Sequence, residues 1–238
     1  METVGILYIC TGAYDVFWDD FYKTCEEHFV GVEKKYFVFT DSEKILNSKD
    51  KYRNMVATYQ ENLGWPGNTL FRFRIFNAHE DLYEGVDYLY FFNANFIFVE
   101  DVGRELLPEG DELVCVRHPG YFDKKSWQLP YCRNIRSKAF IPYFFGKVYV
   151  MGGLNGGKKE TFLKVSKELE RRTDIDYEKG VIATWHDESQ INRYVLENGC
   201  KLMDSSYGYP EGWNIPFKAK LILRDKSKWV DVNNIKKG

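Results

Sequence analysis

The sequence predicts a single α/β domain with a mostly parallel sheet at its centre, and three observations support this prediction. At about 150 residues per domain, the 238 residues suit one large domain. A composition of 44% apolar and 17% aromatic residues is enough to fill its core. Short apolar runs typical of buried strands alternate with segments of helical periodicity. Because no linker rich in Pro, Gly or Ser divides the chain, residues 1–238 are predicted to form one domain.

The first 60 residues have the pattern of a β-α-β unit followed by a third strand. The apolar run at residues 4–10 (VGILYIC) ends at Thr11-Gly12 and is typical of a strand buried on both faces. In residues 15–29 apolar side chains recur every four positions, which predicts an amphipathic helix. A second buried strand at residues 36–40 should pair with the first in parallel through a right-handed crossover. Residues 55–59 are a further candidate strand.

Two polar amides interrupt the next apolar region. After a turn at residues 65–69 and a predicted helix at residues 70–78, a strand at residues 86–92 runs into Asn93-Ala94-Asn95. In a single extended segment, the side chains of Asn93 and Asn95 point to the same side. Two amides there can hydrogen-bond a ribose or a diphosphate but provide no charge for a hard cation. A tight turn between this strand and the apolar residues 96–99 is the alternative explanation.

Two further strands are predicted before ligand-like loops. Residues 113–117 lead into His118-Pro119-Gly120, and residues 147–151 lead into a segment of paired glycines at residues 152–157. The glycines allow a ligand to approach the backbone but are also common in ordinary turns, and a lone histidine is often structural. Open α/β sheets bind ligands beyond the carboxyl ends of their strands. This rule points to Thr11, Asn93, His118 and Gly152.

Two helices are predicted in the second half, at residues 159–171 and from His186 to Val195. The second begins with His186-Asp187-Glu188-Ser189. Asp and Ser are good helix caps and a Glu in the first turn favours the helix dipole, so this segment can simply start a helix. Adjacent carboxylates can also divide their roles in a sugar site, one binding hydroxyls and one facing the anomeric carbon. The spacing leaves both interpretations open.

Charge is nearly balanced over the chain, with 33 basic and 35 acidic residues and a net charge of −2. This balance argues against a protein that coats nucleic acid. Residues 216–238 nevertheless hold seven basic and two acidic side chains, so this end of the chain can meet an anion. The segment from residue 224 onward is expected to be mobile without ligand and to become ordered over it, because it has few apolar residues to bury.

Several functional classes lack their sequence signals. The start METVGILYIC has no basic region followed by a cleavage site, and no stretch reaches the roughly 18 uncharged apolar residues of a membrane helix. The five cysteines form no CxxC pair and the four histidines are scattered, so no zinc pattern appears. Neither a P-loop nor a GxSxG elbow is present. We expect a protein of the reducing cytoplasm without a membrane span.

Taken together, these segments resemble a known family. VFTD at residues 38–41, VDYL at 86–89 followed by NAN, HPG at 118–120, SKAFIP at 137–142, GGLNGG at 152–157 and WHDES at 185–189 occur in its order. The family comprises the retaining glycosyltransferases that include the histo-blood-group A and B transferases and the α-1,3-galactosyltransferases. The resemblance covers about residues 4–228 and looks closest to the short bacterial members.

This resemblance implies a GT-A fold, that is, a Rossmann-like mixed sheet flanked by helices. It implies a nucleotide-binding half at about residues 1–100, a donor and acceptor half at about 101–223, and a mobile basic tail at about 224–238. The implied reaction transfers galactose or N-acetylgalactosamine from a UDP-sugar to the 3-hydroxyl of an acceptor galactose, with the α configuration retained. The implied partners are therefore a UDP-sugar donor and an oligosaccharide acceptor.

The resemblance also assigns roles to individual residues. The residues implied to bind uracil and ribose are Ile9, Cys10, Thr11 and Tyr14. Those implied to surround the donor sugar are Arg72, Asn93, Met151, Gly152, Gly153 and Asp187. Glu188 would be the nucleophile or would stabilise an oxocarbenium-like transition state. Acceptor contacts are implied for His118 and Trp185, and diphosphate contacts for Asn93, Asn95, Lys226 and Lys228. Gln190 departs from a histidine that is usual at its position.

Asn93 and Asn95 stand where the vertebrate enzymes carry the two aspartates of a DxD motif that hold manganese. Because amides bring no charge to a hard cation, we expect neither a metal nor another cofactor here. The leaving-group charge would then be met by protein cations, for which the basic tail is a source.

The expected donor is UDP-N-acetylgalactosamine and the expected acceptor is a fucosylated galactoside. Gly153 would leave space for the N-acetyl group, although Met151 resembles the galactose-using enzymes. The alternatives are a UDP-galactose-dependent α-1,3-galactosyltransferase and a sugar-nucleotide-binding protein without turnover. A glycoside hydrolase is disfavoured, because the adjacent Asp187 and Glu188 cannot readily flank one glycosidic bond.

Overall fold

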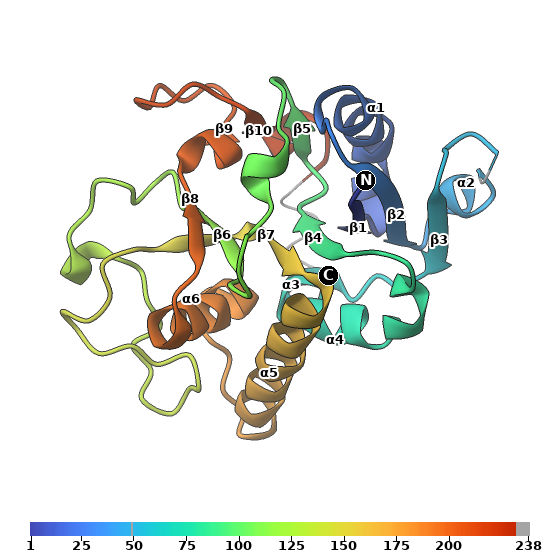
Figure 1. Cartoon of the computed structure of the whole chain (residues 1–238). Helices are drawn as coiled ribbons and strands as arrows, with labels where there is room; N and C mark the ends of the chain where they lie inside the picture. Colours follow the sequence, from blue (N-terminus) through green and yellow to red (C-terminus); the bar gives the residue numbers. More distant parts are fainter. Residues whose placement is uncertain (49, 232–238) are drawn as a thin grey trace.

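The computed structural model describes residues 1–48 and 50–231 and consists of two sheets flanked by helices (Figure 1). The strands of the larger sheet are β1 (Thr3–Ile9), β2 (Glu33–Thr40), β3 (Met55–Tyr59), β4 (Tyr88–Phe92), β6 (Val114–Arg117), β7 (Val150–Lys158) and β8 (Lys201–Met203). The smaller sheet contains β5 (Phe96–Phe98), β9 (Tyr209–Pro210) and β10 (Leu221–Leu223). The helices are α1 (Trp18–His28), α2 (Glu43–Leu46), α3 (Gly64–Leu70), α4 (Arg72–Asn77), α5 (Lys159–Glu178) and α6 (His186–Asn198).

The larger sheet has the strand order β3-β2-β1-β4-β7-β6-β8. Strands β3, β2, β1 and β4 pair with one another in parallel, which confirms the predicted parallel pairing of the first two strands. Strand β7 is antiparallel to both β4 and β6, so the sheet is mixed. The α/β class and the mixed sheet flanked by helices agree with a GT-A-like fold.

Helices cover both faces of this sheet, with α1 on one side and α4, α5 and α6 on the other (Figure 1). Alternate side chains of each strand therefore enter two different cores. In β1, Ile6 and Tyr8 join the core that includes Phe21 of α1, whereas Leu7 joins the core that includes Phe162 of α5. This double burial explains why residues 4–9 of β1 and residues 36–39 of β2 are apolar without interruption.

Two predicted helices begin elsewhere than the sequence pattern suggested. Residues Gly12–Phe17 form a 3-10 segment, and α1 begins only at Trp18. Asp41 after β2 accepts a hydrogen bond from the Gly12 N–H at 2.8 Å, which ties this loop to the sheet edge instead of to the helix. The predicted helix at 70–78 begins earlier, at Gly64, and Phe71 (φ −104°, ψ 18°) divides it into α3 and α4.

The prediction that the glycines at residues 152–157 form a loop is wrong. They lie inside β7, between β4 and β6. A Cβ atom at Gly156 would lie 2.2 Å from the Tyr90 ring of β4, so only glycine lets that ring cross the neighbouring strand. The glycines thus serve close packing within a central strand.

The smaller sheet, ordered β5-β10-β9, connects the end of the chain to the segment that follows β4. Its strand β10 pairs antiparallel with β5, which starts directly after Asn95. Residues 224–231, which come after β10, are thereby brought beside the Asn93-Ala94-Asn95 turn. In the described part of the chain, no helix is both long and apolar enough to cross a membrane.

Candidate active site

A pocket lies at the carboxyl ends of β1 and β4, where the rule for open α/β sheets predicted a ligand. Residues from the first strand and its loop, from α3 and α4, from the end of β4 and from the C-terminal segment line it. They are Ile9, Thr11, Tyr14, Gly64, Trp65, Asn68, Thr69, Arg72, Phe91, Asn93, Ala94 and Lys226. We call this the donor pocket. It unites residues up to 217 positions apart in the sequence.

Three of the four residues implied to bind uracil and ribose line the donor pocket, and the fourth does not. Ile9, Thr11 and Tyr14 line the donor pocket. Cys10 does not, because it is fully buried and both its polar backbone groups are used by the next strand. Its N–H donates to the Phe39 carbonyl at 3.0 Å, and its carbonyl accepts from the Thr40 hydroxyl at 2.7 Å. Cys10 is therefore not among the residues that line the donor pocket, and its contact with a nucleotide stays a prediction.

Arg72 joins the pocket to the other half of the chain. Its guanidinium forms an ion pair with Asp187 of α6, donates to the Gly152 carbonyl at 3.1 Å and contacts the Asn93 amide oxygen at 3.4 Å. It lies 4.1 Å above the centre of the Phe91 ring. Burial raises the pKa of Asp187 above its ordinary value, and the charge of Arg72 opposes that shift. Removal of either partner would leave a buried charge without its counterion.

The Glu188 carboxylate is held by β7 and by the residue that precedes this strand. Its carboxylate accepts hydrogen bonds from the Tyr149 hydroxyl and from the Gly152 N–H, both at 2.7 Å. Burial raises its pKa from 4.5 to about 7, while these two hydrogen bonds act in the opposite direction. The segment from His186 does start a helix, as the first of the two interpretations expects, and the sugar-site roles stay a prediction. A buried carboxylate whose pKa is shifted close to neutral pH is typical of a functional group.

The glycines of β7 make this arrangement possible. A Cβ atom at Gly152 would lie 3.1 Å from Cβ of Glu188 and 3.3 Å from the Asp187 carboxylate. A Cβ atom at Gly153 would lie 2.9 Å from the Asn93 amide nitrogen and 3.1 Å from the terminal methyl of Met151. The space beside Gly153 is thus bounded by the mobile ends of two side chains.

The two asparagines do not point to the same side. The tripeptide forms a turn, with the Phe96 N–H bonded to the Asn93 carbonyl at 3.1 Å, so the alternative of a tight turn is confirmed. Asn93 faces Arg72, whereas Asn95 is buried and its amide donates to the Arg224 carbonyl at 2.5 Å. The Arg224 N–H donates back to the Asn95 carbonyl at 2.9 Å. Asn95 therefore fixes the C-terminal segment, and only Asn93 lines the donor pocket.

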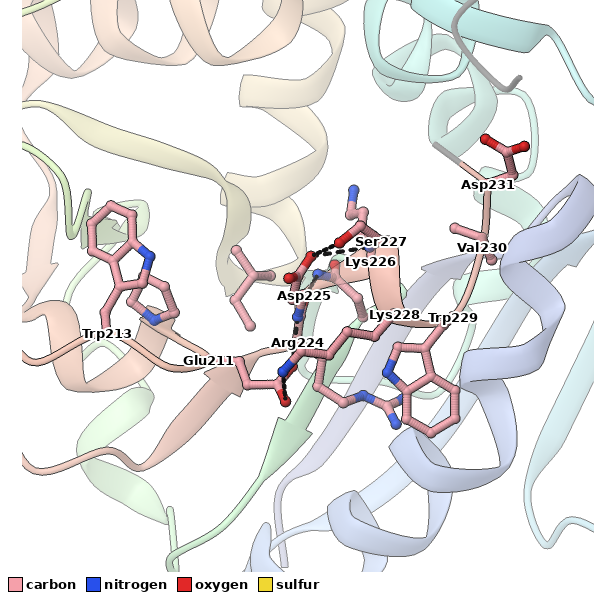
Figure 2. A pocket seen from close by; sticks show the side chains of 13 residues that line it. Glu211, Trp213, Arg224, Asp225, Lys226, Ser227, Lys228, Trp229, Val230 and Asp231 are labelled. Atoms are coloured by element: carbon pink, nitrogen blue, oxygen red, sulfur yellow. Dashed lines mark hydrogen bonds and ion pairs between the residues drawn. The ribbon is translucent and has the colours of Figure 1, made fainter. Parts of the chain in front are cut away.

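The C-terminal segment forms a second, open groove beside the donor pocket (Figure 2). Arg224 is buried between the rings of Phe17 and Trp229 and pairs with Asp20 at 2.7 Å. Lys228 pairs with Glu211 at 2.8 Å. These contacts pack residues 224–230 against the body. The predicted mobility without ligand stays a prediction, and residues 232–238 of the predicted tail lie outside the described residues.

Of the two tail lysines, Lys226 is the one at the donor pocket. It lines both the pocket and the groove, and its ammonium lies 5.1 Å from the centre of the Tyr14 ring. Lys228 lines only the groove. Arg224 was not singled out in the sequence, yet its Nε and Nη2 are buried without a hydrogen-bond partner among the described residues. Basic groups of the segment thus surround the turn after β4.

On the far side of Glu188 lie the residues implied to bind an acceptor. The His118 ring is 5.7 Å from the ring of Tyr149, whose hydroxyl bonds Glu188. The His118 Nδ1 accepts from the Gly120 N–H at 3.0 Å, and burial lowers the pKa of His118 to about 4. The imidazole is therefore neutral, which places its proton on Nε2 as a donor. Trp185 stands half exposed just before α6, and Trp213 approaches Gly120.

Sequence reasoning missed Tyr149, Phe91 and Trp65 as site residues. Tyr149 orients the Glu188 carboxylate, Phe91 supports Arg72, and Trp65 lines the donor pocket. All three are aromatic residues, a class whose side chains usually belong to the core. The available signal was position, since Phe91 and Tyr149 lie one and two residues before the last residues of the predicted strands at 86–92 and 147–151.

The sequence of the chain is similar to those of known glycosyltransferases. The sequence profile of glycosyltransferase family 6 matches residues 1–235. The O-antigen biosynthesis glycosyltransferase WbnI of Escherichia coli is 38% identical over 235 residues, which are 98% of this chain and 99% of that protein.

Two vertebrate relatives match over a smaller share of their own length. The globoside alpha-1,3-N-acetylgalactosaminyltransferase 1 of Gallus gallus is 31% identical over 86% of this chain, and the histo-blood group ABO system transferase 2 of Rattus norvegicus is 28% identical over 89%. The alignments cover 61% and 65% of these two proteins. The family profile spans residues 1–235, and the Escherichia coli relative aligns with 98% of the chain. The chain therefore belongs to glycosyltransferase family 6 and is a glycosyltransferase.

Proposed function

We propose that the protein transfers N-acetylgalactosamine from UDP-N-acetylgalactosamine to the 3-hydroxyl of a galactoside acceptor, with retention of the α configuration and without a metal ion. The observation that carries this proposal is the convergence of Arg72, Asp187 and Glu188 on the β7 glycines beside the donor pocket. The name of the Gallus gallus relative, an N-acetylgalactosaminyltransferase, supports the choice of donor. A fucosylated galactoside is the proposed acceptor.

In this reaction the bond from the anomeric carbon to the diphosphate breaks and the bond to the acceptor oxygen forms, with release of UDP and one proton. Tyr149 and the Gly152 N–H hold the Glu188 carboxylate in place, and its negative charge balances the oxocarbenium character that develops at the anomeric carbon. The Arg72–Asp187 pair orients the donor sugar. Neutral His118 and the exposed ring of Trp185 bind the acceptor, whose sugar rings suit aromatic faces.

The residues after β4 do not suit a divalent cation. Among the described residues, no group of three or more His, Cys, Asp or Glu side chains is placed to hold a metal. Asn93 and Asn95 diverge, and the nearby charged groups include Arg72, Arg224 and Lys226, which would repel a cation. In the proposed reaction, the diphosphate charge is met by Lys226 and backbone donors.

Turnover is accordingly expected to persist at full rate in excess EDTA and to gain less than about twofold from added Mn²⁺. UDP release from UDP-N-acetylgalactosamine with an acceptor present measures this directly. Loss of turnover in EDTA together with its recovery by Mn²⁺ would contradict the metal-free proposal.

Donor choice is expected to respond to Gly153. A methyl group at this position pushes against the Asn93 amide and the end of Met151, and so narrows the space for an N-acetyl group. Gly153→Ala should shift the ratio of kcat/KM values toward UDP-galactose by about 1–3 kcal/mol. Thr161→Ala in α5 serves as the control, because Thr161 lies outside the residues that line the donor pocket. A wild-type preference for UDP-galactose would overturn the donor assignment.

Incubation with each UDP-sugar, with and without a panel of plain and fucosylated galactosides, tests the function itself. The proposal expects an α-1,3-linked product and UDP release that depends on the acceptor. A protein that binds UDP but releases none from any donor would be a binding protein without turnover, and release that ignores every acceptor would indicate hydrolysis.

We also propose that the enzyme works in the cytoplasm. Its cysteines are free thiols, and four of the five are buried where a reduced thiol packs as a small apolar group.

A further inference from the structure

The loop region between β6 and β7 exposes four aromatic side chains to solvent. Trp127 is 54% exposed, Tyr143 60%, Phe144 76% and Phe145 60%. Large aromatic side chains contribute most of their stabilising energy when they leave water, so four together at this exposure are unusual for a surface without a partner. We call these four residues the aromatic loop surface.

The aromatic loop surface is held in a defined shape. The Ser126 hydroxyl donates to the Gly146 carbonyl at 2.5 Å, which joins the Trp127 segment to the Phe145 segment. Arg133 donates to the carbonyls of Ile141 and Pro142, both at 2.6 Å, and stacks 4.4 Å from the Tyr143 ring centre. A small apolar cluster lies in the same region, consisting of Leu129, Tyr131, Ile141 and Tyr149. The exposure of the rings is therefore a built feature of the loop.

Phe144 also has a backbone conformation that a bulky residue rarely adopts, with φ at +68°. A glycine or asparagine would adopt this conformation at lower cost. The chain instead places a phenylalanine there, and its ring is the most exposed of the four in the aromatic loop surface. The folded chain gains nothing from a phenylalanine at this position, because its ring is exposed. A binding partner that buries the ring would explain why the residue is present.

The charge of the same region differs from that of the rest of the protein. Residues 124–147 contain six basic and no acidic side chains, so the remainder of a chain of net charge −2 carries about −8. Lys124 pairs with Asp123 at 3.1 Å. Lys125 and Lys147, which flank the aromatic loop surface, form no ion pair with any described residue. The segment that carries the exposed rings is thus basic, on a protein whose remaining residues are acidic in sum.

We propose that the aromatic loop surface binds an anionic lipid bilayer. Aromatic rings settle at the headgroup level of a membrane, and lysines beside them are attracted to the negative surface potential. An acidic protein would be repelled by such a surface unless its contact face were basic, as this one is. Binding of this kind is peripheral and needs no spanning helix. It is independent of the proposed donor and acceptor.

The test is sedimentation of the full-length protein with vesicles of phosphatidylcholine containing 30% phosphatidylglycerol, and with vesicles of phosphatidylcholine alone. We expect binding to the anionic vesicles, at least tenfold weaker binding to the neutral ones, and loss of binding as salt rises. Phe144→Asn combined with Phe145→Ser should lower the partition coefficient at least tenfold. Asn suits the positive φ of residue 144, and both rings are exposed, so the variant should fold normally.

Two matched variants separate this effect from general changes of the surface. Lys125→Glu combined with Lys147→Glu should abolish binding to anionic vesicles, whereas Lys23→Glu combined with Lys164→Glu changes the net charge equally and should leave most of it. Tyr59→Ser removes a 65% exposed ring at the end of edge strand β3 and should have no effect. UDP affinity should be unchanged in all of these variants, whether or not the proposed transfer reaction is correct.

Three results would overturn the proposal. The first is the absence of binding to anionic vesicles, and the second is equal loss of binding in the two charge-reversed variants. The third is a concentration-dependent dimer, seen by light scattering, that the Phe144→Asn and Phe145→Ser changes disrupt without an effect on vesicle binding. That result would assign the aromatic loop surface to a contact between copies of the chain.

Discussion

Glu188→Gln is expected to lower kcat by about 10²–10⁴-fold while the protein remains folded and binds UDP with unchanged affinity. The amide keeps the size of the side chain and can still accept the hydrogen bond of the Gly152 N–H. It removes the negative charge that faces the anomeric carbon in the proposed reaction. Steady-state kinetics with the preferred donor and acceptor measure the loss, and calorimetric titration with UDP measures the affinity.

The same substitution is expected to stabilise the protein at alkaline pH. Because the pKa of Glu188 is about 7 when folded and 4.5 ordinarily, the folded state binds more protons than the unfolded state between these values. The wild type therefore loses stability as pH rises through this window, and the glutamine variant does not share that loss. At pH 8 the variant should exceed the wild type by about 2–3 kcal/mol in free energy of unfolding, with almost no difference near pH 4.

The pH dependence of the wild-type reaction follows from the same group. Only the ionised carboxylate can balance positive charge, so kcat/KM should fall as pH drops below about 7. Glu160→Gln is the matched control, since Glu160 lies in the first turn of α5 as Glu188 does in α6, but is 81% exposed. If Glu188→Gln keeps a near-normal kcat, or is less stable than the wild type at pH 8, Glu188 is only a residue of the helix terminus.

Arg72→Met is expected to cost about 3–5 kcal/mol of stability, because it leaves the Asp187 carboxylate buried without its counterion. Methionine keeps an unbranched side chain over the Phe91 ring, so lost packing contributes little. The value of kcat/KM should fall by about 10²-fold or more, since the guanidinium also joins Gly152 and Asn93 at the donor pocket. Urea unfolding and steady-state kinetics measure the two effects.

Two further variants distinguish the roles of the ion pair. Arg72→Met combined with Asp187→Asn removes both charges and should regain more than half of the lost stability, while activity stays low. Arg74→Met, on the same helix, breaks an exposed pair with Asp174 and should cost only about 0.2–1 kcal/mol. Arg72 and Asp187 do not act as a buried charge pair if Arg72→Met costs no more than Arg74→Met.

Most of the architecture was predictable from the sequence because apolar periodicity is a local property. The strand at residues 55–59 is confirmed at the predicted bounds, and the parallel pairing of β1 with β2 is confirmed as well. The α/β class follows from the same patterns. The glycine segment of β7 was misjudged, because a run of glycines resembles a turn until the Tyr90 ring beside it is known.

The candidate site was predictable as a set of residues and not as an arrangement. Motif order pointed to Arg72, Asp187 and Glu188. It also indicated the family, and the comparison confirmed the family. The sequence left open whether Asn93 and Asn95 lie on one side of an extended segment or in a turn, and the turn found here sends Asn93 to Arg72 and Asn95 to Arg224. Motif order also implied a nucleotide contact for Cys10, whose side chain is fully buried.

The sequence by itself determined the fold class, the family and the identity of the charged residues, since these depend on periodicity and on short motifs that one stretch of chain contains. Only the tertiary structure decided that Glu188 accepts a hydrogen bond from Tyr149 and that Arg224 forms an ion pair with Asp20. It also decided that four aromatic rings stay exposed to solvent. Burial and pairing arise between segments as many as 204 residues apart. The pKa of a carboxylate or the partner of an arginine is therefore fixed only when the chain has folded.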